Sequence, residues 1–158
     1  MNVLVLCTGN SARSILLESI LNRDGAGVDI NAFSAGARPS GRVHPQSLLL
    51  LATKGYPTGG LRSKSWDEFA GPDAPRMDAV ITVCGSAAGE TCPCWPGAPI
   101  RAHWGVEDPA AASAADWPAG FEAAYRHLHT RAEAFLSLPL GKMSGAVLAA
   151  ELARIGTI

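Results

Sequence analysis

The sequence predicts an α/β protein in which a parallel β-sheet carries helices on both faces. Short apolar runs alternate along the chain with longer stretches in which apolar residues recur at helical spacing. This alternation is typical of strand-helix-strand units around a parallel sheet. The length of 158 residues also suits one domain with a sizeable hydrophobic core. We therefore expect a single three-layer α/β/α domain.

The expected elements follow from the same patterns, taken in order along the chain. Apolar, β-rich runs predict four strands, at residues 2–6, 28–33, 79–83 and 100–103. Helical spacing predicts helices at residues 14–23, 45–54, 66–70 and 121–136. At 143–155, Leu and Ala repeat at helical intervals, which predicts a C-terminal helix docked on the body or, alternatively, a partner-binding helix. Residues 71–75 and 109–120 are rich in Gly, Pro and Ala and are expected to be loops, not domain linkers.

Charge and N-terminal composition argue against two classes of partner. Lys and Arg total 13 and Asp and Glu total 14, and no basic stripe is present, so nucleic acid is not expected to bind. The first residues lack a charged signal-peptide region, and no apolar run approaches the length of a membrane span. We expect a cytoplasmic protein without membrane contact. Four cysteines in a reducing compartment indicate redox chemistry or metal binding, not a disulfide framework.

The segment 7–14 has the pattern of an oxyanion-binding loop. A cysteine, five residues, an arginine and a serine follow the first apolar run directly. Backbone N–H groups between a strand and a helix bind a tetrahedral oxyanion, and the same field lowers the pKa of a thiol. We expect Cys7 to be a nucleophile with a lowered pKa and Arg13 to hold two oxygens with its planar guanidinium. The expected oxyanion-binding residues are Thr8, Gly9, Asn10, Ser11, Ala12, Arg13 and Ser14.

Two residues of this loop have further expected roles. Gly9 would allow the tight turn, and Ser14 could donate a hydrogen bond to the thiolate. The alternative interpretation makes Cys7 a small buried residue and Arg13 a surface charge. The preceding strand and the amphipathic stretch at 15–21 favour the catalytic interpretation.

A second group of thiols follows the strand expected at 79–83. Cys84, Cys92 and Cys94 fall within one loop, and sites in open parallel sheets form outside the carboxyl ends of the strands. We therefore expect Cys7 and Cys84 to open onto the same crevice. Small residues after Cys84 would let a thiol swing to the nucleophile and return to its neighbour.

Two other interpretations of these cysteines stay open. A zinc site could combine Cys84, Cys92, Cys94 and His103, although the seven-residue gap after Cys84 is wider than structural zinc sites usually have. Alternatively, one or more of the thiols, Cys94 in particular, could be inert packing residues. The short Cys92-Pro93-Cys94 spacing would strain a direct disulfide between these two cysteines.

Asp108 is the third candidate catalytic residue. It follows the last expected strand within the sequence Glu107-Asp108-Pro109, and an aspartate beyond a strand end can protonate a leaving oxygen as a general acid. Asp-Pro is also common at turns and helix starts. The assignment of Asp108 as the acid therefore rests on its place after the strand and not on the Asp-Pro pair itself. We assign no chemistry to His44, His127 or His129.

Taken together, these residues resemble the arsenate reductases built on the low-molecular-weight protein tyrosine phosphatase fold. The resemblance covers residues 1–137 and implies a four-stranded parallel sheet in the order 2-1-3-4, with residues 138–158 as a C-terminal helical extension of the same domain. The matching motifs are the Cys7 loop, Ser34-Ala35-Gly36, Thr82-Val83-Cys84 with Cys92-Pro93, His103-Trp104-Gly105 and Asp108-Pro109-Ala110.

The resemblance also implies a reaction. Cys7 attacks arsenate, Asp108 protonates the departing oxygen, and Cys84 attacks Cys7 to release arsenite, after which Cys92 takes over the disulfide. Arsenic bound to a cysteine can accept two electrons from sulfur when a second thiol reaches the first, whereas phosphate leaves by hydrolysis. Phosphate or sulfate would compete with arsenate, and a thioredoxin, a glutaredoxin or a small thiol would supply electrons. No cofactor and no catalytic metal is implied.

Some positions depart from the family pattern. The gap between Cys84 and Cys92 is one residue longer than in thioredoxin-coupled members, and Cys94 is an additional thiol, so the reductant and the resolving thiol stay open. Family members can hold a monovalent cation behind the loop, through residues matching Asn10, Glu18 and Ser34. The aspartate that completes that pattern falls at Ser65 here, with Asp67 nearby.

Two competing functions remain. The first is a low-molecular-weight protein tyrosine phosphatase, which shares the nucleophile loop and the acid. Such phosphatases usually have a tyrosine after Asp-Pro, where Ala110 and Ala111 stand in this sequence. The second is a non-catalytic metal-binding module that uses the loop from Cys84 to Cys94, and the intact loop from Cys7 to Arg13 argues against it.

Overall fold

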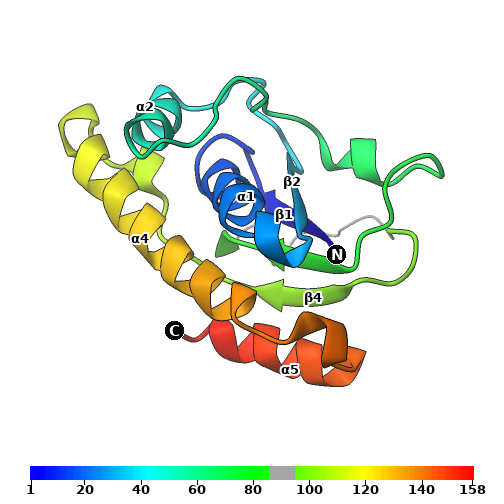
Figure 1. Ribbon diagram of the computed structural model, residues 1–158. Coiled ribbons are helices and arrows are strands. Elements are labelled where there is room, and N and C mark those ends of the chain that lie inside the picture. The colour runs from blue at the N-terminus through cyan, green and yellow to red at the C-terminus, as the bar shows by residue number, and fades with distance from the viewer. Residues whose placement is uncertain (86–94) are drawn as a thin grey trace.

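The sheet has four parallel strands in the spatial order β2-β1-β3-β4. The computed structural model describes residues 1–85 and 95–158 (Figure 1). The strands are β1 (Asn2–Cys7), β2 (Asn31–Gly36), β3 (Ala79–Thr82) and β4 (Ile100–His103). The expected parallel sheet and its strand order are confirmed. Because the strands are parallel, the residues that follow β1, β3 and β4 meet at one edge of the sheet.

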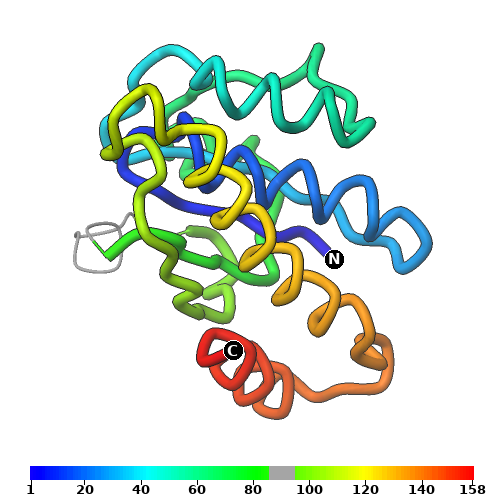
Figure 2. The backbone as a smooth tube through the Cα atoms, turned by 90° about the vertical axis from the view of Figure 1, so that its left-hand side faces the viewer, coloured from blue at the N-terminus to red at the C-terminus, as the bar shows by residue number. Residues whose placement is uncertain are grey.

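Four α-helices are described: α1 (Arg13–Asp24), α2 (Pro45–Thr53), α4 (Trp117–Leu136) and α5 (Gly145–Ile155). The two views show α4 crossing the helical layer, from beside α2 at one end to beside α5 at the other (Figures 1 and 2). In the described ranges, no helix has both the length and the apolar character needed to cross a membrane. Short 3-10 helices lie at Ala26–Val28, Trp66–Phe69, Pro109–Ala111, Ala114–Asp116 and Leu140–Lys142.

Alternating side chains of the strands fill two separate cores. Val3, Val5 and Ile81 point to the face covered by α1, α4 and α5, and all three are fully buried. Leu4 and Leu6 point to the opposite face. There, the cover described by the structure is the 3-10 helix at Trp66–Phe69 together with Met77 and Trp95. Burial of both faces accounts for the continuous apolar run of β1.

The structure differs from the prediction in one strand, one helix and one loop. The second strand was expected at 28–33 but is Asn31–Gly36, because Val28 belongs to a 3-10 helix that ends with Asp29 in the left-handed region, at φ 57°. The Asn22 side chain of α1 then exchanges two hydrogen bonds with the Ala32 backbone (2.8 and 2.9 Å), which fixes β2 against this helix. The expected helix at 66–70 is one 3-10 turn, and the expected loop at 109–120 holds two 3-10 turns and the start of α4.

The C-terminal stretch forms α5 and docks on the end of β4. The indole N–H of the buried Trp104 donates to the Leu152 carbonyl at 2.9 Å. Gly156 approaches so closely that a Cβ there would lie 2.4 Å from the His103 carbonyl oxygen. The buried Arg131 of α4 donates to the carbonyl of Gly105 at 3.1 Å and to Ile158 at 3.0 Å. These contacts hold the segment that leads from β4 towards Asp108.

Removal of the buried apolar contact of α5 should destabilise the whole domain. Leu152 is fully buried, so Leu152→Ala should lower the free energy of unfolding by about 2–5 kcal/mol. Val147 on the same helix is 52% exposed, and Val147→Ala should change it by less than about 0.5 kcal/mol. Urea unfolding followed by circular dichroism measures both. Equal effects of the two substitutions would show that α5 does not contribute to the core.

Candidate active site

The loop between β1 and α1 is held so that its carbonyl groups face outwards. The segment 38–44 supplies the donors and runs in the same direction as the loop. The Thr8 carbonyl accepts from the Arg38 N–H at 3.0 Å, Gly9 from Ser40 at 2.9 Å and Ser11 from His44 at 3.0 Å. Because the C=O and N–H of one trans peptide group point in opposite directions, carbonyls that bond on the outer side leave their N–H groups for the inner side, as an anion requires.

Asn10 fixes the shape of this loop from behind. Its backbone lies in the left-handed region at φ 44°, and its side chain is fully buried. The amide nitrogen donates to the Ser14 and Ser34 hydroxyls, both at 2.9 Å, and the amide oxygen accepts from the Lys64 N–H at 2.9 Å. The Ser14 hydroxyl thus accepts a hydrogen bond from Asn10, which leaves its proton for a donor role, and the expected hydrogen bond to the thiolate stays a prediction.

Gly36 at the end of β2 makes room for the loop. It pairs with Cys7 in the sheet register, and a Cβ at this position would lie 2.5 Å from the Thr8 carbonyl oxygen. The Ser34-Ala35-Gly36 motif therefore requires glycine at position 36 for a steric reason. Any side chain here would push the loop away from β2.

Arg13 connects the loop with the candidate acid. One terminal nitrogen, Nη1, donates to the Val106 carbonyl at 2.9 Å, and the other lies 3.4 Å from a carboxylate oxygen of Asp108. The side chain is only 12% exposed, whereas that of Asp108 is 44% exposed. The Nε of Arg13 is buried and has no hydrogen-bond partner among the described residues. The guanidinium is thus fixed on one side and keeps a donor for a further acceptor.

The two thiols expected to share a crevice do lie in contact. Cys7 and Cys84 are 5% and 3% exposed, respectively, and their side chains form a hydrogen bond. The Thr8 hydroxyl lies 3.5 Å from the Cys84 sulfur. Cys92 and Cys94, also predicted to act or pack in this region, lie outside the described residues. The structure therefore assembles Cys7, Arg13, Cys84 and Asp108 of the predicted set.

Asp108 begins a 3-10 turn at the mouth of the site. Its carboxylate accepts from the Ala110 N–H at 3.1 Å, which is the N-cap role that Asp-Pro commonly plays. His44 caps α2 through Nδ1, which accepts from the Gln46 N–H, and its ring packs 4.5 Å from Trp117. Burial lowers the pKa of His44 more than nearby Asp108 raises it.

Comparison with known proteins places this arrangement in a family. Residues 2–145 match the family described as Low molecular weight phosphotyrosine protein phosphatase. The chain belongs to this family.

Several relatives within the low molecular weight phosphatase family are described as arsenate reductases. The arsenate reductase of Bacillus licheniformis is 36% identical over 108 residues, which are 68% of this chain and 73% of that protein. The arsenate reductase of Halalkalibacterium halodurans is 34% identical over 111 residues, which are 70% of this chain and 76% of that protein. A solved arsenate reductase in the phosphate binding state superimposes with a TM-score of 0.68 and 28% identity, over 86% of this chain and 96% of its own.

The resting state of the nucleophile differs from the prediction. The hydrogen bond with Cys84 and burial raise the pKa of the Cys7 thiol far above its ordinary value, while the Arg13 charge and the Thr8 N–H lower it. A lowered pKa was expected from the loop N–H groups and the Arg13 charge. The second thiol, placed against the first, outweighs that field because a thiol that shares a proton with its neighbour is held in the neutral form.

The monovalent cation that the low molecular weight phosphatase fold can hold does not fit these side chains. The ammonium of Lys64, which sequence reasoning missed, lies 3.4 Å from the Ser34 hydroxyl and 3.9 Å from the Glu18 carboxylate. Ser65 caps the turn at Trp66–Phe69 instead. Within residues 1–85 and 95–158, no cluster of three or more His, Cys, Asp or Glu side chains is placed to bind a metal. The alternative zinc site needs Cys92 and Cys94, outside these ranges.

Removal of the second thiol should make Cys7 more acidic. In Cys84→Ala, the largest cause of the raised pKa is absent while Arg13 and the Thr8 N–H remain, so the pKa of Cys7 should fall. The pH dependence of Cys7 alkylation by iodoacetamide, followed by peptide mass spectrometry, measures it. The midpoint should move to lower pH than in the wild type. Arg13→Gln should move it in the opposite direction. An unchanged midpoint in Cys84→Ala would contradict the assigned cause, whatever happens to the limiting rate.

Proposed function

We propose that this member of the low molecular weight phosphatase family is an arsenate reductase. The observation that carries the proposal is the contact between Cys7 and Cys84 at the oxyanion loop. Hydrolysis of a phosphate ester needs one thiol, whereas reduction of a bound oxyanion needs a second thiol that can reach the first. The relatives described as arsenate reductases support the same conclusion.

The first step forms a bond between sulfur and arsenic. The Cys7 thiolate attacks the arsenic of arsenate, whose oxygens bind the loop N–H groups and the free Arg13 donor. One oxygen leaves as water after it takes a proton from Asp108. The ion pair between Arg13 and Asp108, at 3.4 Å, keeps the acid next to the guanidinium that binds the oxyanion.

The second step transfers the electrons. The Cys84 thiolate attacks the Cys7 sulfur, the new sulfur-sulfur bond forms, and the electron pair of the sulfur-arsenic bond passes to arsenic. Arsenic(V) becomes arsenic(III) and leaves as arsenite, while the two thiols become one disulfide. The hydrogen bond between the Cys7 and Cys84 side chains supports this step.

The third step resolves the disulfide. We propose that Cys92 attacks Cys84, which frees Cys7, and that an external thioredoxin, glutaredoxin or small thiol reduces the resulting Cys84-Cys92 disulfide. Thiol-disulfide exchange of this kind passes through in-line attack by a thiolate. A reducing compartment such as the cytoplasm would supply such a reductant. Phosphate and sulfate share the shape and charge of arsenate and should compete for the loop.

The relay predicts different arrested states for two substitutions. Cys84→Ser should bind phosphate and retain slow hydrolysis of aryl phosphates but lose arsenate reduction. Cys92→Ser should complete one turnover and stop with Cys7 and Cys84 joined. Peptide mapping under non-reducing conditions, after one equivalent of arsenate, identifies these species. Cys94→Ser serves as the control and should behave as the wild type. A Cys84-Cys94 disulfide in the wild type would make Cys94 the resolving thiol.

If Asp108 is the general acid, the effect of its substitution on the hydrolysis rate should depend on the leaving group. Asp108→Asn should slow hydrolysis of an aryl phosphate with a poor leaving group by about 10²- to 10⁴-fold. A substrate with a good leaving group should be affected much less, because its leaving oxygen needs no proton. The measurement is the ratio of the hydrolysis rates of the two substrates, compared between the wild type and Asp108→Asn. A uniform loss over both substrates would instead indicate that Asp108 only positions Arg13.

A phosphatase without reductase activity is the outcome that would replace this proposal. It requires that the wild type hydrolyses aryl phosphates efficiently and that stoichiometric arsenate produces neither arsenite nor an intramolecular disulfide.

A further inference from the structure

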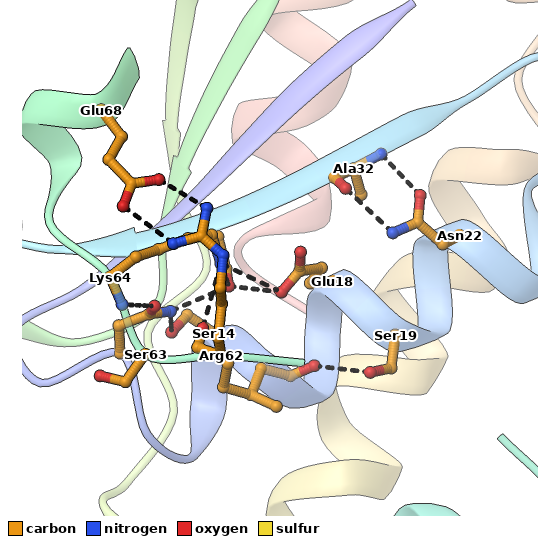
Figure 3. Close-up of polar contacts among 12 residues, drawn as sticks. Ser14, Glu18, Ser19, Asn22, Ala32, Arg62, Ser63, Lys64 and Glu68 are labelled. Atoms are coloured by element: carbon orange, nitrogen blue, oxygen red, sulfur yellow. Dashed lines mark hydrogen bonds and ion pairs between the residues drawn. The ribbon is translucent and has the colours of Figure 1, made fainter. Parts of the chain in front are cut away.

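Lys64 is an unusual side chain to find behind an anion-binding loop. It is 8% exposed, and lysine is rarely buried unless its charge is paired. Its ammonium donates to the Arg62 carbonyl at 3.2 Å and to the Ser34 hydroxyl at 3.4 Å, and it lies 3.9 Å from Glu18 of α1. Figure 3 shows Lys64 and Glu18 facing each other, with the Arg62-Glu68 pair beside them.

The three partners of the Ser34 hydroxyl fix the direction in which it donates its proton. It accepts from the Asn10 amide nitrogen at 2.9 Å and from the Lys64 ammonium. A hydroxyl has one proton and two lone pairs, so its proton goes to the Glu18 carboxylate, the third partner, at 2.5 Å. Every hydrogen-bonding position of Ser34 is therefore used.

Lys64 is linked to both ends of the Asn10 amide, to one directly and to the other through Ser34. Its backbone N–H donates to the amide oxygen at 2.9 Å, and its ammonium reaches the amide nitrogen through Ser34. Gly36 accounts for this placement, because its N–H donates to the Lys64 carbonyl at 2.9 Å and it pairs with Ser65 beside the end of β2. The chain direction at 63–65 thus sends the Lys64 side chain inwards.

The oxygens that would bind a monovalent cation are already used by this network. The Asn10 oxygen accepts an N–H, and the Ser34 and Glu18 oxygens face the ammonium. We propose that Lys64 is a positioning residue whose ammonium serves as a built-in cation, and that it holds Asn10 and the oxyanion loop without a bound metal ion. The proposal rests on the proposed function only insofar as the loop binds an oxyanion.

Charge balance supports the pairing. Burial raises the pKa of Glu18 and is opposed chiefly by the Lys64 charge, while burial lowers the pKa of Lys64 and is opposed by Glu18. The charge of each group therefore favours the ionised form of the other. Loss of the lysine alone would leave the buried Glu18 carboxylate with only the charge of Arg62, which already pairs with Glu68, and this is unfavourable unless another cation enters.

The test compares the wild type with Lys64→Ala in potassium chloride and in tetramethylammonium chloride at equal ionic strength. The tetramethylammonium ion is too large for a site vacated by one side chain. The two measurements are the melting temperature and the dissociation constant of inorganic phosphate. The wild type should show no difference between the salts, with dissociation constants that agree within about twofold. In Lys64→Ala, phosphate binding should weaken at least about tenfold without potassium, and potassium should raise the melting temperature and restore part of the affinity.

Two further variants test whether Lys64 acts through its positive charge or only through packing. Lys142 is exposed, so Lys142→Ala removes the same charge elsewhere and should behave as the wild type. Glu18→Gln combined with Lys64→Met removes both charges, and this variant should bind phosphate more weakly with no response to potassium. Potassium rescue of Lys64→Ala must therefore depend on the Glu18 carboxylate.

The proposal would be overturned by a potassium response of the wild type, by a Lys64→Ala variant that ignores potassium, or by a double variant that binds phosphate as tightly as the wild type. The first and third outcomes remain measurable even when Lys64→Ala fails to fold. Failure of the wild type to bind phosphate would overturn the proposed function instead. The melting temperatures would then still report on the built-in cation.

Discussion

The backbone turn at Asn10 is the constraint on which the site depends. A non-glycine residue at positive φ is unfavourable unless its surroundings hold it there, and here Ser14, Ser34 and the Lys64 N–H hold the side chain. With this turn the carbonyls of the loop bond outwards, and the N–H groups of the same trans peptides point the opposite way. The buried polar cluster behind the loop and the anion site in front of it are therefore two sides of the same structure.

The contact between the two thiols serves reduction and opposes the first attack. In the proposed mechanism Cys84 must be near Cys7 to attack its sulfur, so that the electron pair of the sulfur-arsenic bond passes to arsenic, yet the hydrogen bond between the two thiols raises the pKa of Cys7. The charge of Arg13 works in the other direction, and its guanidinium also holds Asp108. One buried arginine therefore connects the proposed nucleophile Cys7 with the proposed acid Asp108, so substitutions here should not act independently.

The fold and most of the site were predictable because they depend on local patterns and on sheet topology. Apolar runs located β1, β3 and β4, and the parallel arrangement brought Cys7 and Cys84 together. Two features depend on tertiary contacts that leave no such pattern. The start of β2 is set by the left-handed Asp29, and Lys64 is buried because its segment pairs with Gly36. A single lysine in an aperiodic stretch would ordinarily be assigned to the surface.

Strand register finally explains why position 84 decides between two chemistries. Leu6 pairs with Thr82, and the Val83 N–H donates to the Leu6 carbonyl at 2.9 Å, so Cys84 must follow alongside Cys7. The Val83 carbonyl accepts from the Val106 N–H at 3.1 Å, and the Val106 carbonyl in turn accepts from Arg13. A slip of one residue would turn Cys84 to the other face of the sheet. The loop and the acid alone suit phosphate hydrolysis, and this register adds the second thiol that reduction requires.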